Sequence, residues 1–214
     1  MADEPERCCF DEWSACYAKR ARSRRLGAVS TDLIRGLGVA GLEGRTVLDV
    51  GCGAGGLVLE TLDRGAVSAT GLDLSSASIG AARRIASERG HVGRARFEVG
   101  DGASAALAPH DVVVLDKVLC CYPNVDALLT NSLAAARSVY AFSVPPSAGF
   151  RGRIAKALAR AANTWYRLRR RKFAGFREHV HDVGALDARV RAAGFTAVFS
   201  RRRFAWDLAV YARP

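Results

Sequence analysis

The sequence lacks the features that mark several classes of protein. No apolar run approaches the ~18 residues that a transmembrane helix requires, and the segment from Met1 to Arg7 is polar and acidic rather than signal-like. None of the six cysteines shows the two-residue spacing of zinc ribbons and thioredoxin motifs. These absences predict a cytoplasmic protein whose cysteines stay reduced.

Acidic residues are also missing from one long stretch. Between Ala127 and Arg177 there is no Asp or Glu, whereas Lys and Arg number eleven. The net charge of the whole chain is +11, so this stretch alone can account for the excess. A basic region of this kind is compatible with a nucleic acid or with an anionic membrane surface as a partner.

What the chain does contain is the material for one α/β domain. It has 214 residues, of which 50% are hydrophobic, enough for a full core. The stretch from Thr46 to Gly56 is an apolar run that ends in three glycines spaced by two, and a helical pattern begins at Leu57. This order predicts a buried strand, a tight turn and the start of a helix.

The glycines allow two kinds of cofactor. Gly51, Gly53 and Gly55, preceded by Asp49, resemble the first motif of Rossmann-like, S-adenosylmethionine-dependent methyltransferases, Asp/Glu-x-Gly-x-Gly-x-Gly. The dinucleotide pattern Gly-x-Gly-x-x-Gly is satisfied as well. However, an acid just before the first glycine would repel a diphosphate, whereas it suits the α-ammonium group of S-adenosylmethionine. A glycine-rich turn in some other α/β protein is the alternative.

Two further acids stand where the next strands should end. Asp73, followed by Leu74, lies 22 residues after the first glycine, where a carboxylate can accept from both ribose hydroxyls. Asp101, followed by Gly102, ends the run Ala95 to Val99, and in the methyltransferase family an Asp here accepts from the adenine amine. The alternatives are an N-cap and a turn-ordering role. With three motifs in register, the chain is identified as a member of the class I methyltransferases, which use S-adenosyl-L-methionine and release S-adenosyl-L-homocysteine.

The resemblance implies the fold. We expect an α/β, Rossmann-like sheet of seven strands, mostly parallel, in the order 3-2-1-4-5-7-6 with the last strand antiparallel. Residues 1–214 form a single domain, which divides into an N-terminal helical lid (1–42), a cofactor-binding core (43–146), a basic helical insertion between strands 5 and 6 (147–181), and a terminal helix and hairpin (182–214). Within the lid, Ser30-Thr31-Asp32 is predicted to cap the second helix.

The acceptor side is predicted from the end of the fourth strand. In open α/β sheets, ligands bind beyond the carboxyl ends of the strands, so Asp116 and Lys117 should border the cofactor's methionine moiety. The predicted substrate-side residues are Tyr17, Cys120, Cys121, Tyr122 and His179. Residues 115–123 and 179–181 are similar to the magnesium-protoporphyrin O-methyltransferase branch and its uncharacterised bacterial relatives. That branch has a histidine where this chain has Cys121, so any role of that histidine does not carry over.

Methyl transfer needs positioning more than it needs acid or base groups. A carboxylate acceptor is already ionised, whereas a phenol, amine or thiol would benefit from a base. His181, with Tyr122 as a hydrogen-bonding neighbour, is the catalytic candidate, and a loop or cap role is the alternative. We expect O-methylation of an anionic or aromatic small molecule; an RNA or DNA methyltransferase and a thiol- or metalloid-directed enzyme are the alternatives. No metal site is expected, because adjacent cysteines are poorly arranged to hold one ion and also fit as small packed residues.

The basic insertion suggests a second kind of contact. Within residues 151–172, apolar and cationic side chains recur at helical spacing, which predicts a peripheral contact with an anionic membrane. Nucleic acid is disfavoured as a partner, because the fourth strand is not followed by Asn/Asp-Pro-Pro-Tyr/Phe and no Pro-Cys occurs. The sequence does not predict the acceptor, the pathway or the oligomeric state.

Overall fold

The computed structural model describes residues 10–168 and 176–213. Its sheet has seven strands in the order β3-β2-β1-β4-β5-β7-β6. The strands are β1 (Thr46–Val50), β2 (Ser68–Asp73), β3 (Ala95–Val99), β4 (His110–Asp116), β5 (Ala136–Val144), β6 (Thr196–Arg203) and β7 (Trp206–Ala212). β7 pairs antiparallel with both β5 and β6, and the other pairs are parallel. The predicted strand order and the antiparallel last strand are confirmed.

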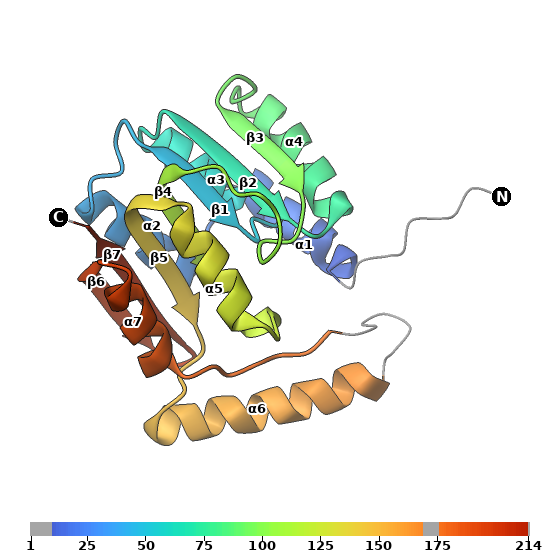
Figure 1. Ribbon diagram of the computed structural model, residues 1–214. Coiled ribbons are helices and arrows are strands. Elements are labelled where there is room, and N and C mark those ends of the chain that lie inside the picture. Colours follow the sequence, from blue (N-terminus) through green and yellow to red (C-terminus); the bar gives the residue numbers. More distant parts are fainter. Residues whose placement is uncertain (1–9, 169–175, 214) are drawn as a thin grey trace.

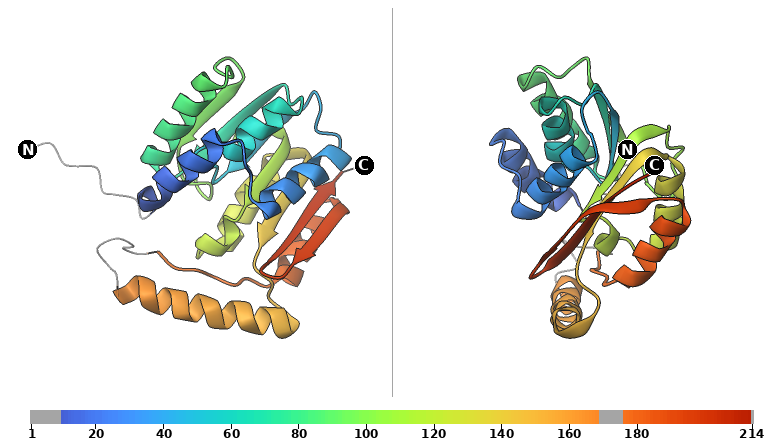
Figure 2. Two further views of the ribbon diagram at one scale, coloured as in Figure 1. Left: turned by 180° about the vertical axis from the view of Figure 1, so that it is seen from behind. Right: turned by 90° about the vertical axis from the view of Figure 1, so that its left-hand side faces the viewer.

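Helices cover both faces of this sheet (Figures 1 and 2). The helices of the described residues are α1 (Asp11–Arg22), α2 (Ala28–Val39), α3 (Gly56–Asp63), α4 (Ser76–Glu88), α5 (Val125–Ala134), α6 (Gly149–Leu168) and α7 (Val183–Ala192), with a short 3-10 helix η1 (Leu119–Cys121) after β4. All of the α-helices except α6 belong to the two layers. In the described part of the chain, no helix is both long and apolar enough to cross a membrane.

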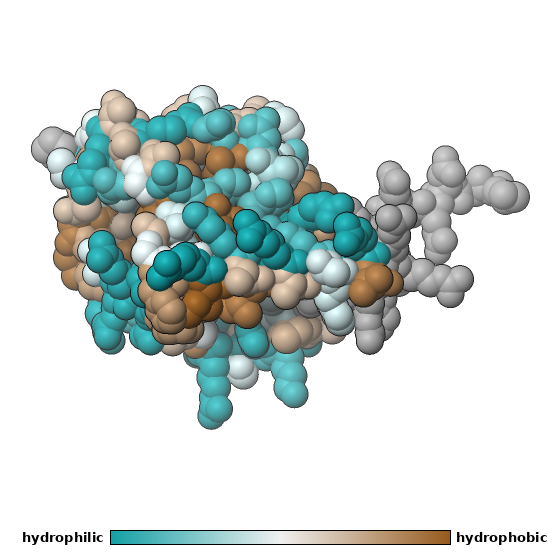
Figure 3. All heavy atoms as spheres, turned by 90° about the horizontal axis from the view of Figure 1, so that it is seen from below, coloured by the Kyte–Doolittle hydropathy of each residue, from teal (hydrophilic) through white to brown (hydrophobic). Residues whose placement is uncertain are grey.

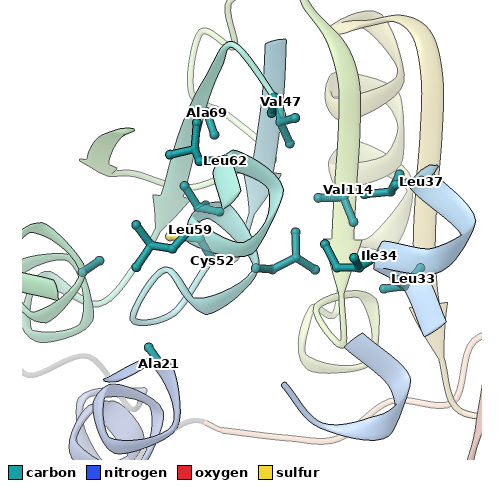
Figure 4. Close-up of a cluster of buried hydrophobic side chains, with 14 of the residues drawn as sticks. Ala21, Leu33, Ile34, Leu37, Val47, Cys52, Leu59, Leu62, Ala69 and Val114 are labelled. Carbon is teal, nitrogen blue, oxygen red and sulfur yellow. The ribbon is translucent and has the colours of Figure 1, made fainter. Parts of the chain in front are cut away.

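Two apolar clusters hold the layers together. On one face, α2 and α3 pack on β1, β2 and β4 through side chains such as Leu37, Leu59 and Val114, and Ala21 of α1 packs beside them (Figure 4). On the other face, the helices α5 and α7 pack on a second set that includes Leu115 and Tyr140. Successive side chains of β4 point to opposite faces of the sheet, and both faces are buried. This explains why no polar residue interrupts the run of valines in β4.

The second helix of the N-terminal segment begins earlier than predicted. α2 starts at Ala28 with the extended Gly27 as its N-cap, so the prediction that Ser30-Thr31-Asp32 caps this helix is wrong. The physical reason is that two of these side chains are engaged elsewhere. Ser30 donates to Asp116, and the buried Asp32 accepts from the Nε of Arg203 at 2.6 Å.

The helix α6 lies outside both layers, along the edge where the parallel strands end (Figure 1). At its start Arg151 forms an ion pair with Asp207 at 2.7 Å. Farther along, Asn163 accepts from the backbone N–H of Glu178 at 2.7 Å, and the Tyr166 hydroxyl donates to the Glu178 carboxylate at 3.0 Å. The basic residues 169–172, which belong to the predicted membrane contact, lie outside the described residues.

Candidate active site

Glycines in the turn between β1 and α3 have the positive φ angles of the left-handed region. Gly51 has φ +77°, and a Cβ there would lie 2.3 Å from Cγ2 of Val118. Gly53 has φ +53°, and a Cβ there would lie 3.5 Å from the ring of Tyr17. Both conformations are ones that glycine adopts at little cost. The turn therefore leaves its backbone close to the residues that follow β4 and to α1.

A cavity of about 340 Å³ lies beside this turn, at the carboxyl ends of β1, β2 and β4. Its wall contains every residue predicted to bind the cofactor except Gly55, namely Asp49, Gly51, Gly53, Asp73, Leu74, Asp101, Gly102, Asp116 and Lys117. Gly55 serves packing instead. It has φ +77°, and a Cβ there would lie 2.7 Å from Cε1 of Phe97.

Asp49 is the most unusual group in this wall. Its side chain is buried, and among the described residues its Oδ1 has no hydrogen-bond partner. Burial, with further contributions from the carboxylates of Asp116 and Asp73, holds the pKa of Asp49 well above its usual range. A buried acceptor without a partner is costly, and a bound cation would satisfy it. Asp49 therefore fits the ammonium group of an amino-acid ligand.

The two other predicted acids already have donors. Asp73 accepts from the backbone N–H of Gly53 at 2.8 Å and of Ser75 at 2.9 Å, and burial raises its pKa. Asp101 accepts from the Tyr122 hydroxyl at 2.7 Å. Burial and this bond to Asp101 raise the pKa of Tyr122 to about 12, so Tyr122 is a donor rather than a base near neutral pH. Each carboxylate is thus held in place by local groups at the cavity wall.

Lys117 is fixed by a network that the sequence did not reveal. It is one of the described non-glycine residues with positive φ, at +63°. Its Nζ donates to Asp116 at 2.9 Å and to Ser30 at 2.8 Å, and its backbone N–H donates to Ser143 at 2.9 Å. The Ser143 hydroxyl in turn donates to Asp116 at 2.6 Å. The available signal for Ser143 was a polar residue within the apolar second half of β5, whereas Ser30 stood out from its helix in no such way, because Thr31 and Asp32 beside it are also polar.

A second cavity, of about 360 Å³, adjoins the first. Phe10, Tyr17, Lys117 and Cys121 belong to the walls of both cavities. The wall of the second cavity contains the aromatic rings of Phe10, Tyr17, Tyr166, Phe176, Phe204 and Trp206. We call it the acceptor cavity, because a flat apolar molecule in it would face the cofactor cavity across the shared residues.

The predicted substrate-side residues divide between the cavities. Tyr17 and Cys121 line both, and Cys120 and His179 line the acceptor cavity alone. Tyr122 lines only the cofactor cavity, and His181 belongs to the wall of neither. Tyr17 stays protonated near neutral pH, because burial, with a smaller contribution from Cys121, raises its pKa to about 12.

The two histidines have different surroundings. Their rings stack with centroids 5.6 Å apart. The Nε2 of His181 donates to the backbone carbonyl of Tyr122 at 3.1 Å, which ties this segment to the end of η1. Burial, together with the charges of His181 and Arg177, lowers the pKa of His179. His179 is therefore a neutral imidazole on the acceptor cavity at neutral pH.

The adjacent cysteines lie side by side. The Sγ atoms of Cys120 and Cys121 are 3.6 Å apart. The hydrogen bond to Cys121 and burial hold the pKa of Cys120 well above its usual range, so Cys120 stays a thiol. Soft metals bind thiolates, and among the described residues no group of three His, Cys, Asp or Glu side chains is arranged to hold a metal ion.

Two charged residues of the acceptor cavity were not predicted. Glu178 and Arg151 line its wall, where Arg151 is paired with Asp207 and Glu178 accepts from Tyr166. One signal for Glu178 was present, since it is the acid that ends the long acid-free stretch. No comparable signal marked Arg151 among its many basic neighbours.

Comparison with known proteins agrees with this geometry. Residues 47–139 match the family model described as "Methyltransferase domain". Two curated relatives are similar, both named ubiquinone biosynthesis O-methyltransferase. The one from Alkalilimnicola ehrlichii is 50% identical over 23% of this chain, and the one from Paracidovorax citrulli is 39% identical over 39% of it. The matched stretches span only 20% and 33% of the length of these relatives.

A solved structure shares the fold over nearly the whole chain. It is magnesium protoporphyrin IX methyltransferase from Synechocystis PCC 6803 with bound S-adenosylhomocysteine, and it covers 95% of this chain and 97% of its own with a TM-score of 0.65. Sequence identity to it is 21%, so this similarity shows the fold and not the acceptor. The match to the methyltransferase family over residues 47–139, together with the motif around Gly51, makes S-adenosylmethionine the cofactor of this domain.

Proposed function

Because residues 47–139 form a class I, Rossmann-like S-adenosylmethionine-dependent methyltransferase domain, we propose that the protein methylates an oxygen of a small, lipophilic aromatic molecule. The observation that carries this proposal is the aromatic acceptor cavity, which meets the cofactor cavity at Phe10, Tyr17, Lys117 and Cys121. The names of the curated relatives, both O-methyltransferases, support the choice of oxygen.

The cofactor supplies an electrophilic methyl group on a sulfonium, and the chain supplies the position. We propose that Asp49 holds the ammonium group, Asp73 the ribose hydroxyls and Asp101 the adenine side. The residues Asp116 and Lys117 border the methionine end through the network described above. Because Gly51 and Gly53 have no side chain, the cofactor can approach the backbone of the turn between β1 and α3 closely.

On the acceptor side, a histidine is suited to take a proton from the acceptor. His179 lines the acceptor cavity and is neutral near pH 7 because its pKa is lowered, so it can serve as the base for a phenolic acceptor. His181 and Tyr122, the candidates predicted from the sequence, act instead as positioning residues. They are bonded to each other through the Tyr122 carbonyl, and the Tyr122 hydroxyl is bonded to Asp101.

Filling the acceptor cavity tests this proposal. Ala159 is buried on the cavity wall, so Ala159→Trp should abolish methyl transfer to phenols while S-adenosylhomocysteine binds with unchanged affinity. Ala161→Trp, on the exposed side of the same helix, is the matched control and should retain activity. Methyl transfer that survives Ala159→Trp would place the acceptor elsewhere. The assay follows radiolabelled methyl from the cofactor onto phenols, aromatic carboxylates, thiols and RNA.

The identity of the acceptor atom gives a second test. His179→Gln should lower kcat for phenols about 100-fold with little change in KM, because a general base typically contributes 10²–10⁴-fold. Aromatic carboxylates, which are already ionised, should lose little. Equal losses for phenols and carboxylates would show that His179 does not act as a base. Preferential transfer to thiols or RNA would favour one of the alternative functions instead.

A lipophilic aromatic acceptor partitions into lipid. We therefore also propose that the enzyme works in peripheral contact with an anionic membrane. The basic and apolar side chains of α6 support this location.

A further inference from the structure

The helix α6 carries three different faces. The face toward the protein contains Gly152 and Ala159, which are buried. A second face is cationic, with residues spaced by three, four and seven positions: Arg153, Lys156, Arg160 and Arg167. A third face is apolar and exposed, and its large side chains are Phe150, Leu158, Trp165 and Leu168, with 67%, 62%, 45% and 79% of their surface exposed.

Among the described residues, no acid lies within ion-pair distance of Arg153, Lys156, Arg160 or Arg167. Seen from below, the surface over α6 shows hydrophobic side chains directly beside a row of hydrophilic ones (Figure 3). Large exposed apolar side chains in a row are unusual on a soluble surface and mark a contact site.

The acceptor cavity reaches this surface. Leu158 belongs both to the exposed apolar face and to the cavity wall. Phe204, in the turn between β6 and β7, is 67% exposed and also lines the cavity. The Nε of Arg151 donates to the Phe204 carbonyl at 3.2 Å, so the turn is fixed beside the first turns of α6. The mouth of the cavity is thus rimmed by exposed apolar side chains.

We propose that the exposed apolar and cationic faces of α6, the lipid-docking face, bind the surface of a bilayer that contains anionic lipid. The apolar side chains enter the headgroup boundary, and the four cations contact the headgroups. The acceptor cavity then opens toward the lipid. Only this last step, entry of the acceptor from the membrane, rests on the proposed methyl transfer.

Two other occupants fit these side chains less well. A nucleic acid would pair with the cations but would leave Phe150, Leu158 and Leu168 in water. A second copy of this chain would cover the apolar face, but a two-fold contact through α6 would bring the cationic faces together. An anionic bilayer fits both faces at once, because its charged headgroups can contact the cationic face while the acyl boundary beneath them takes up the apolar face.

Vesicle binding by the full chain tests the docking without any methyl transfer. The protein should co-sediment with vesicles of phosphatidylglycerol and phosphatidylcholine, and much less with phosphatidylcholine alone. Arg153→Gln with Arg160→Gln should weaken binding to the anionic vesicles roughly 25-fold, from about fivefold per cation. The matched control, Arg84→Gln with Arg96→Gln, removes the same charge from exposed positions on α4 and β3 and should change binding less than twofold.

The apolar face is tested separately. Phe150→Ser with Leu168→Ser should weaken vesicle binding at least tenfold, because both side chains would leave the headgroup boundary. Val39→Ser with Val92→Ser is the control, since these valines are exposed to a similar extent, 63% and 71%, on other elements. All four positions are exposed, so circular dichroism should show an unchanged fold.

Several results would overturn the proposal. Equal binding to both vesicle types would do so, as would equal losses in the α6 variants and their controls. Tighter binding to a 20-nucleotide RNA than to anionic vesicles would assign the cations to nucleic acid. A dimer in sedimentation velocity that Phe150→Ser with Leu168→Ser converts to a monomer would assign the face to a second copy. Vesicle binding with no methyl transfer to any acceptor would keep the docking and refute only the proposed methyl transfer.

Discussion

Asp49 gives the sharpest test of the cofactor site, because one substitution should move binding and stability in opposite directions. Asp49→Asn keeps the shape of the side chain and removes its charge. Its Oδ1 is buried and has no partner among the described residues, so a bound ammonium group would form an ion-pair hydrogen bond there. Hydrogen bonds to charged groups contribute about 2 kcal/mol, so the affinity for S-adenosylhomocysteine should fall roughly 30-fold.

Asp49→Asn should change the stability of the ligand-free protein in the opposite direction from its effect on ligand affinity. The pKa of Asp49 is raised in the folded protein, so the native state binds this proton more tightly than the unfolded chain does. The resulting stabilisation is present at low pH and is lost as the pH rises from the ordinary Asp value of about 3.9 through the raised pKa. An asparagine at this position has no charge, so it avoids the cost of burying an ionised carboxylate at high pH. The ligand-free Asp49→Asn protein should therefore melt no lower than the wild type at pH 8.

Asp111 is the matched control. It lies near the amino end of β4, away from the cavity, and accepts from the backbone N–H and the hydroxyl of Thr46 at 2.9 and 2.8 Å. These bonds lower its pKa, so its stabilisation is present above the ordinary Asp value and is lost as the pH falls through the lowered pKa. Asp111→Asn should cost about 1 kcal/mol, or about 3 °C at neutral pH, and leave ligand affinity unchanged.

Isothermal titration calorimetry and thermal melting of both variants decide the matter. Wild-type affinity should also increase as the pH rises through the raised pKa of Asp49, and this dependence should disappear in Asp49→Asn. If Asp49→Asn binds S-adenosylhomocysteine as tightly as the wild type, Asp49 does not hold the ammonium group. If it melts well below the wild type at pH 8, the reasoning about its buried charge is refuted.

Two further predictions concern the framework of the site. Gly51→Ala should lose ligand affinity and about 3 kcal/mol of stability, because it combines a positive φ with a Cβ 2.3 Å from Val118. The control is Gly44→Ala, where φ is +72° but nothing lies within 4 Å of the added Cβ. It should lose only about 1 kcal/mol of stability and bind the ligand normally, as thermal melting and titration calorimetry would show. Arg203→Met should lower the melting temperature by about 10 °C, because it removes the closest partner of the buried Asp32, and loss of one partner of a buried ion pair costs about 3–5 kcal/mol. A melt of Arg203→Met within 2 °C of the wild type would show that the remaining partners suffice.

The grouping of the three predicted acids around one cavity could be predicted from the sequence, because each acid belongs to a local pattern at the end of a strand. Asp49, Asp73 and Asp101 each stand at or just beyond the end of a strand, and parallel strands bring these ends to one edge of the sheet. Gly55 shows the limit of a motif. The pattern requires glycine there, but in the structure the requirement comes from the ring of Phe97 rather than from the cavity.

The start of α2 could not be predicted for a different reason. Ser30 and Asp32 have the composition of an N-cap, and local rules favour them in that role. Their actual partners are Asp116, 86 residues away in sequence, and Arg203, 171 residues away. Tertiary bonds of this range determined where these side chains point, and no local pattern contains that information.

The acceptor cavity is the extreme case of this dependence on distant contacts. Its wall is formed by α1, the end of β4 with η1, α6, residues 176–180 and the β6–β7 turn. Among these segments, only Lys117 after β4 and η1 lie within the matched residues 47–139. The residues proposed to hold the cofactor can thus stay constant while the wall segments of the acceptor cavity change with the acceptor. His179 and Glu178 are neighbours in sequence, yet one is fixed to η1 and the other to α6. A change of acceptor specificity should therefore require changes in α6 or in residues 176–181, and should leave affinity for S-adenosylhomocysteine unaltered.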